Sequence, residues 1–114
     1  MPDGNNVVVI LVTVPDDETA AGIGRRLLEE RLVACANIVS GLRSIYWWQG
    51  KLEDTDEVLM LLKAREEDVV RITARIHELH PYSVPEVIAT RVVSGFAPYL
   101  EWVYKETDRS DADR

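Results

Sequence analysis

The chain has 114 residues, of which 46% are hydrophobic and 29% are charged, and its formal net charge is −7. This length and composition fit a single globular domain with a hydrophobic core. The acidic balance, with a pI near 4.8, argues against nucleic-acid binding, which relies on cationic contacts to phosphate. It favours solubility or the attraction of cations instead.

The sequence also bears on the compartment. No apolar run approaches the roughly 20 residues that a membrane helix needs. Residues 1–6 lack the basic start and apolar stretch of a signal peptide. The single cysteine, Cys35, rules out an internal disulfide framework and is typical of a reducing environment. We therefore expect a cytoplasmic protein with no membrane partner.

The first predicted elements are a strand and a helix. The continuous apolar run over residues 7–14 predicts a strand that is buried on both sides or nearly so. Asp16 is the predicted N-cap of the following helix, since aspartate is a preferred capping residue and acidic residues follow it in the first turn. We expect this helix to end near Arg31.

A long β-hairpin is predicted next. Its first arm spans residues 34–48 and is interrupted at Gly41, where we expect a bulge or kink. Gln49-Gly50 fits a tight primed turn, and the second arm returns over residues 51–64. Arms of some 15 residues at about 3.3 Å each are roughly 50 Å long, so the tip must overhang its own domain.

The second half of the chain predicts a helix over residues 66–79 with one apolar stripe, closed by Pro81. A strand over 85–93 and a short helix over 97–105 follow. Residues 107–114 are polar and small, and we expect them to form a frayed tail.

This order of elements predicts a ferredoxin-like α+β sandwich of the split βαβ type, as one domain over residues 1–106. Two helices would cover one face of the sheet, so the other face would need a partner. Trp47 and Trp48 support this expectation, because neighbouring side chains in a strand point to opposite faces. A second copy of the chain is the simplest cover, and we expect an obligate homo-oligomer.

Three residues are candidate metal ligands. His77 and His80 are three residues apart near a helix end, so they could share a face and hold a metal ion. The same spacing also suits two side chains that interact with the helix dipole. Cys35 fits a small buried side chain, and a catalytic role would require a nearby base such as His80.

A ligand cleft is a second candidate site. Lys63 and Glu86 are charges within apolar strands, so each must be paired or line a cleft. Together with Tyr82 and Trp48, they would suit a small anionic or zwitterionic ligand. A structural ion pair at a subunit junction explains the same residues. The acidic cluster of the second hairpin arm fits either cation attraction or a solvated tip: Glu53, Asp54, Asp56 and Glu57.

Six blocks of sequence carry a family resemblance: Val-Pro-Asp at 14–16, Arg-Leu-Val-Ala-Cys-Ala-Asn-Ile at 31–38, Ser-Ile-Tyr-Trp-Trp-Gln-Gly-Lys at 44–51, Glu-Val at 57–58, His-Pro-Tyr-Ser-Val-Pro-Glu-Val at 80–87 and Tyr-Leu-Glu-Trp at 99–102. In this order and spacing they resemble the CutA family, the divalent-cation tolerance proteins. The resemblance covers residues 7–105.

The resemblance implies a ferredoxin-like fold in a homotrimer similar to the PII signalling proteins, with hairpins that embrace neighbouring subunits. It implies a role in tolerance to copper and other divalent ions, and no enzymatic reaction. The family's copper ligands are a first-strand cysteine and a His-His pair before Pro-Tyr. Here these positions hold Val12, Leu79 and His80, so Cu(II) binding would need Cys35, His77 or another subunit.

The leading interpretation is a trimeric, cytoplasmic protein of the divalent-cation response that binds metal weakly or a small ligand at intersubunit clefts. The alternative is a PII-like signalling module whose ligand controls a protein partner. An enzyme that uses Cys35 and His80 is a third hypothesis.

Overall fold

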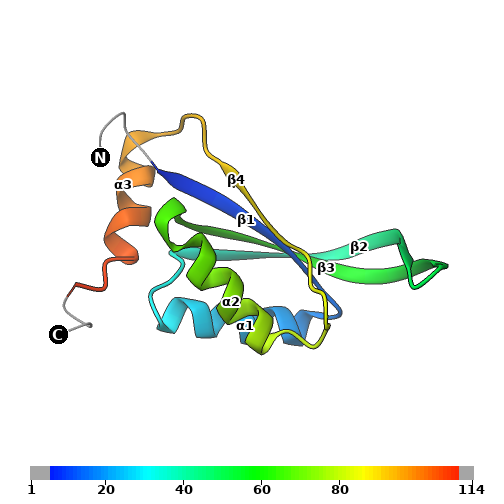
Figure 1. The fold of residues 1–114 in the computed structure, drawn as a ribbon. Helices are drawn as coiled ribbons and strands as arrows, with labels where there is room; N and C mark the ends of the chain where they lie inside the picture. Colours follow the sequence, from blue (N-terminus) through cyan, green and yellow to red (C-terminus); the bar gives the residue numbers. More distant parts are fainter. Residues whose placement is uncertain (1–5, 111–114) are drawn as a thin grey trace.

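The computed structural model describes residues 6–110 and contains the predicted sequence of elements (Figure 1). The strands form one antiparallel sheet in the order β2-β3-β1-β4. This arrangement confirms the ferredoxin-like βαββαβ fold with an additional C-terminal helix. The elements are β1 (Val7–Val14), α1 (Asp17–Glu29), β2 (Cys35–Trp48), β3 (Lys51–Arg65), η2 (Glu66–Asp68), α2 (Val69–Leu79), β4 (Val87–Arg91) and α3 (Ala97–Glu106).

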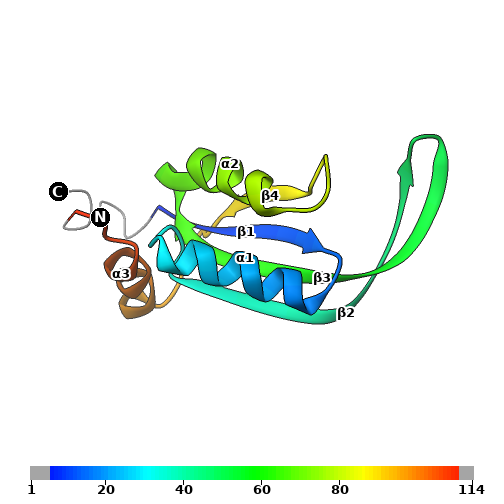
Figure 2. The same ribbon diagram turned by 90° about the horizontal axis from the view of Figure 1, so that it is seen from below.

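The main core lies between the sheet and helices α1 and α2, which cover the same face (Figure 2). Alternate residues of β1, among them Ile10 and Val12, point into this core and are fully buried. Helix α1 approaches the sheet closely at Gly24, where an added Cβ would lie 3.2 Å from the Cβ of Ala36. A contact of this length is unusually tight, so the absence of a side chain at Gly24 lets the helix pack close to the sheet.

Within residues 6–110, the opposite face of the sheet is covered only at one end, by α3, whose Leu100 and Val103 pack on Val7 and Ala34. Further along that face, Val39 and Ile88 are exposed. This uncovered face is the one for which the sequence predicted a partner. None of the helices within residues 6–110 is long and apolar enough to cross a membrane.

The hairpin of β2 and β3 extends well beyond the helices (Figure 2), and the longest dimension of the molecule is 46 Å. Gln49 and Gly50 both have positive φ angles, 49° and 79°, which confirms the primed turn. The pairing register shifts between Val39 and Leu42, and Gly41 has a φ of 84°. The predicted bulge is therefore present and redirects the outer part of the hairpin.

Some boundaries differ from the expected ones. Helix α1 ends at Glu29 because Arg31 adopts a left-handed φ of 58° and donates from Nη1 to the Glu106 carboxylate at 2.9 Å. The second helix begins as the 3-10 turn η2 and continues as α2. Strand β4 is shorter than expected, at Val87–Arg91, because its pairing with β1 spans only these residues.

The expectation of a frayed tail from Thr107 differs from the structure. Thr107 is 1% exposed, and its hydroxyl donates to the carbonyl of Val103. Arg109 forms an ion pair with the buried carboxylate of Asp68, with Nη2 2.8 Å from Oδ1. The ion pair with Asp68 thus holds the chain in place as far as Arg109. Residues 111–114 lie outside the described residues.

Candidate ligand cavity beside the hairpin

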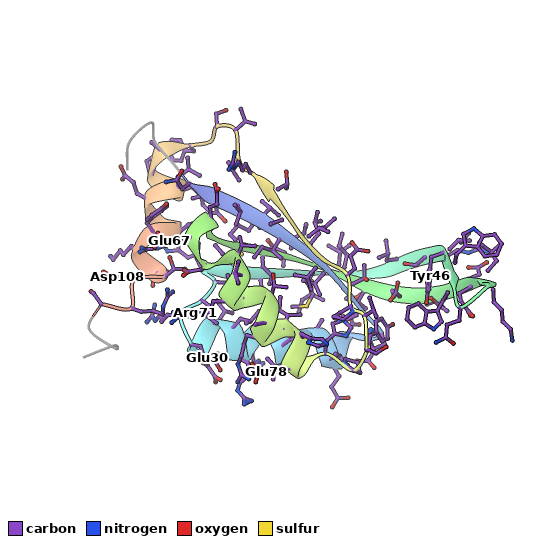
Figure 3. The ribbon with its side chains drawn as sticks, viewed as in Figure 1. Glu30, Tyr46, Glu67, Arg71, Glu78 and Asp108 are labelled. Carbon is purple, nitrogen blue, oxygen red and sulfur yellow. The ribbon has the colours of Figure 1, made fainter. Side chains whose placement is uncertain are left out.

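A cavity of about 860 Å³ lies where the hairpin leaves the sheet. Its walls come from the end of β1, from both arms of the hairpin and from the loop between α2 and β4. Figure 3 shows Tyr46 on the overhanging part of the hairpin, away from the helix that carries Arg71 and Glu78. The aromatic and acidic residues of the walls are Tyr46, Trp48, Tyr82, Asp56, Glu57 and Glu86.

The cavity contains a buried carboxylate, that of Glu57, which is only 6% exposed. The hydroxyl of Tyr82 donates to Glu57 Oε2 at 2.9 Å. Burial, followed by this bond to Glu57, raises the pKa of Tyr82 from 10.0 to about 12. Tyr82 therefore remains a neutral donor to Glu57 at physiological pH. Glu57 belongs to the acidic cluster of the second hairpin arm, and the one local signal of its burial is the apolar run 58–62 that directly follows it.

His80 is buried behind the cavity and supports Tyr82. Its Nε2 lies 2.8 Å from the carbonyl oxygen of Thr13, and its Nδ1 accepts from the backbone N–H of Tyr82 at 3.1 Å. Because a carbonyl only accepts and an amide only donates, the ring is neutral with its proton on Nε2. Both ring nitrogens are thus engaged in holding the loop, and the ring packs 4.7 Å from that of Tyr82.

Cys35 lies elsewhere, on the uncovered face near α3. Its partner in the sheet is Lys63, whose Nζ lies 4.0 Å from Cys35 Sγ and also donates to the side-chain oxygen of Asn37. Burial, together with the neighbouring Cys35, raises the pKa of Tyr99. Lys63 pairs with Val9, which is four residues along β1 from Thr13, the residue that His80 contacts. At the rise of a strand, Lys63 is therefore roughly 13 Å from the position where His80 meets β1.

The structure thus brings three of the four predicted cleft residues, Trp48, Tyr82 and Glu86, to one cavity. It places Lys63 outside that cavity, with Asn37 as its partner. Lys63 and Glu86 do not form an ion pair within residues 6–110, and a pair across a subunit junction stays a prediction. Glu86 directly precedes Val87, which pairs with Val12 of β1, whereas Lys63 pairs with Val9 of β1. The two side chains therefore lie toward different ends of the sheet.

Residues 8–106 match the family described as CutA1 divalent ion tolerance protein. The divalent-cation tolerance protein CutA of Thermus thermophilus is 44% identical over 99 residues, which cover 87% of this chain and 96% of that protein. The crystal structure of CutA from Xylella fastidiosa has a TM-score of 0.88 and 41% identity, covering 91% of this chain and all of that one.

The chain belongs to the CutA family. Not all CutA relatives have the same length: the rice protein CutA 1 is 40% identical over 90% of this chain, but the match spans only 58% of the rice protein. Their compartments also vary. The rice protein is named chloroplastic, and a solved CutA from Archaeoglobus fulgidus is described as periplasmic.

The three candidate metal ligands do not fit a resident metal site of this CutA chain. His80 uses both ring nitrogens in hydrogen bonds, Cys35 lies beside Lys63, and His77 is exposed on α2. Within residues 6–110, no group of three or more His, Cys, Asp or Glu side chains is arranged to hold a metal ion. A copper ion needs several such donors at once, and residues 6–110 of one chain do not bring them together.

The Tyr82–Glu57 bond predicts a stability change at alkaline pH. The native state holds the Tyr82 proton more tightly than the unfolded state does, since its pKa is about 12 instead of 10.0. The stabilisation is therefore fully present below pH 10 and is lost as the pH rises through 12. Urea unfolding from pH 9 upward should show a steeper decline for the parent than for Tyr82→Phe. Equal slopes in the two proteins would contradict this role of Tyr82.

Proposed function

We propose that the protein acts in the divalent-cation response as a homotrimer and that the cavity beside its hairpin binds a small ligand. The observation that supports this most strongly is the construction of the cavity. It combines a buried carboxylate with aromatic side chains on a hairpin that leaves its own domain. Its volume of about 860 Å³ is within the usual range of small-molecule sites.

Assembly is supported by the apolar surface that one chain exposes. Trp47 is 73% exposed at the tip of the hairpin, and Ile45 and Leu52 are exposed beside it. The uncovered face of the sheet adds Val39 and Ile88. Exposed apolar surface of this extent is typical of interfaces between subunits. If each hairpin covers a neighbouring copy, the cavity lies at a subunit boundary.

A signalling role is the second candidate. Tyr46 and Trp48 belong both to the cavity wall and to the overhanging hairpin. A bound ligand would therefore contact the segment that reaches a neighbouring subunit. A PII-like module, in which the ligand controls a protein partner, would use this connection. A cytoplasmic location remains a prediction from the single cysteine.

The cavity can be tested with a variant that fills it. Ser44 lines the cavity on β2, so Ser44→Phe should occupy part of the space without adding charge. A panel of cationic, anionic and neutral small molecules would be titrated calorimetrically into the parent and the variant. We expect at least one class to bind the parent and to lose affinity in Ser44→Phe. The control Ser94→Phe, outside the cavity, should bind as the parent does. Binding by neither protein would refute the ligand site.

The role of His80 gives a separate prediction about copper. His80→Ala leaves the Thr13 carbonyl and the Tyr82 N–H without partners, so it should lower the free energy of unfolding by about 1–3 kcal/mol. It should leave the affinity for Cu(II) unchanged, because neither ring nitrogen is available for a metal. His77→Ala is the control for stability. A fall in Cu(II) affinity specific to His80→Ala would show that the ring binds copper.

A further inference from the structure

We infer that the ligand of the cavity beside the hairpin is an organic ammonium cation. This inference depends on the proposed ligand site and specifies its chemistry. The walls carry three carboxylates and three aromatic side chains. Among the described residues, no lysine or arginine lines the cavity. The charge and the ring content of the walls therefore both favour a cation that also has apolar surface.

The charge of the Glu57 carboxylate is unbalanced in the cavity. This side chain is more than nine-tenths buried, yet the ion pairs of residues 6–110 do not include it. Its hydrogen bond comes from the neutral hydroxyl of Tyr82, to Oε2 only. A buried carboxylate is costly without a positive partner. A cation in the cavity would supply that partner.

The aromatic side chains of the cavity favour the same class of ligand. Tyr46 and Trp48 reach the cavity from the hairpin, and Tyr82 reaches it from the loop before β4. Alkylammonium groups bind favourably over aromatic rings, because the ring face is electronegative and the alkyl groups tolerate an apolar surface. Carboxylates together with aromatic rings are thus more selective for an organic cation than either would be alone.

The cavity fits an organic cation better than it fits a metal ion or an anion. The carboxylates of the cavity do not belong to any group of three or more side chains able to hold a metal ion within residues 6–110. A volume of about 860 Å³ also exceeds the needs of a bare ion. An anion would require Lys63, which lies with Asn37 and Cys35 outside the cavity.

Three probes of nearly equal shape test the inference: choline, which is cationic, 3,3-dimethylbutan-1-ol, which is neutral, and 3,3-dimethylbutanoate, which is anionic. Each would be titrated calorimetrically into the assembled protein. We expect saturable binding of choline and at least about tenfold weaker binding of the other two probes. The variant Glu57→Gln keeps an acceptor for Tyr82 but loses the charge. It should therefore lower the affinity for choline about tenfold or more.

The matched control is Glu101→Gln, which makes the same change on the exposed surface of α3 at the other end of the molecule (Figure 1). It should bind choline as the parent does. If Glu57→Gln does not fold, the double variant Asp56→Asn with Glu86→Gln provides the same test. Equal binding of choline and the neutral alcohol, or tighter binding of 3,3-dimethylbutanoate, would overturn the cation inference and leave the ligand site standing. Failure of all three probes to bind would overturn the inference. If the wider panel also failed, the ligand site would fall with it.

Discussion

Trp47→Asp is expected to convert the assembly into monomers or to prevent folding. In one chain the Trp47 side chain is 73% exposed, so its replacement removes few contacts within the domain. In the proposed trimer the same side chain would be buried against a neighbour, where tryptophans commonly contribute 2 kcal/mol or more, as an order of magnitude. An aspartate there would also bury an unpaired charge. Light scattering coupled to size-exclusion chromatography would measure the mass.

The matched control for this prediction is Val70→Asp. Val70 is another exposed apolar side chain, 83% accessible, but it lies on α2 away from the hairpin and the uncovered face. Its replacement should leave the mass of the assembly unchanged. If Trp47→Asp keeps the parent's mass and stability, the hairpin tip does not form the interface. Loss of assembly in both variants would instead point to a general effect of added charge.

Arg109→Met is expected to destabilise the protein by about 3–5 kcal/mol, because it leaves a buried carboxylate without its partner. The side chains of Asp68 and Arg109 are 7% and 16% exposed, and their closest atoms are 2.8 Å apart. Asp68 ends the turn η2 and is the N-cap residue of α2, so its charge cannot move to solvent without displacing the start of that helix. Urea unfolding of the parent and the variant would measure the loss.

A double variant distinguishes the ion pair from simple packing. Asp68→Leu combined with Arg109→Met replaces both charges by apolar side chains, and should recover much of the stability lost in Arg109→Met. The salt bridge on the outer face of the hairpin, Arg43 with Asp54, is the control, since both side chains are exposed. Arg43→Met should leave the free energy of unfolding nearly unchanged, because solvent screens this exposed pair. A small loss in Arg109→Met, or no recovery in the double variant, would contradict the importance of this pair.

Most of the fold could be predicted because its signals are local. The apolar run of β1, the N-cap at Asp16 and the turn at Gln49-Gly50 depend on residues a few positions apart. The side chain of Asp16 accepts from the N–H of Thr19 at 2.7 Å, as an N-cap should. Gly41 marked the bulge because few other residues adopt its φ of 84°.

The candidate site was predicted less completely because it depends on distances across the sheet. Lys63 and Glu86 are both charges in apolar strands, but strand register places them at different ends of the sheet. Glu57 looked like one more acid near a solvated tip, and only the position of Tyr82 shows that it is buried and bonded. The anchoring of the chain by Arg109 likewise depends on Asp68, which is 41 residues away.

Sedimentation equilibrium of the unmodified protein at micromolar concentration measures the proposed assembly without any substitution. In the proposed trimer, the cavity, the hairpin and the uncovered face all contribute to contacts between identical chains. We predict a single species with three times the 12.9 kDa mass of one chain. No monomer should be detected when the protein is diluted to the lowest concentration that absorbance can measure. A well-folded species of 12.9 kDa would contradict the claim, because the exposed tryptophans would then have no neighbour to cover them.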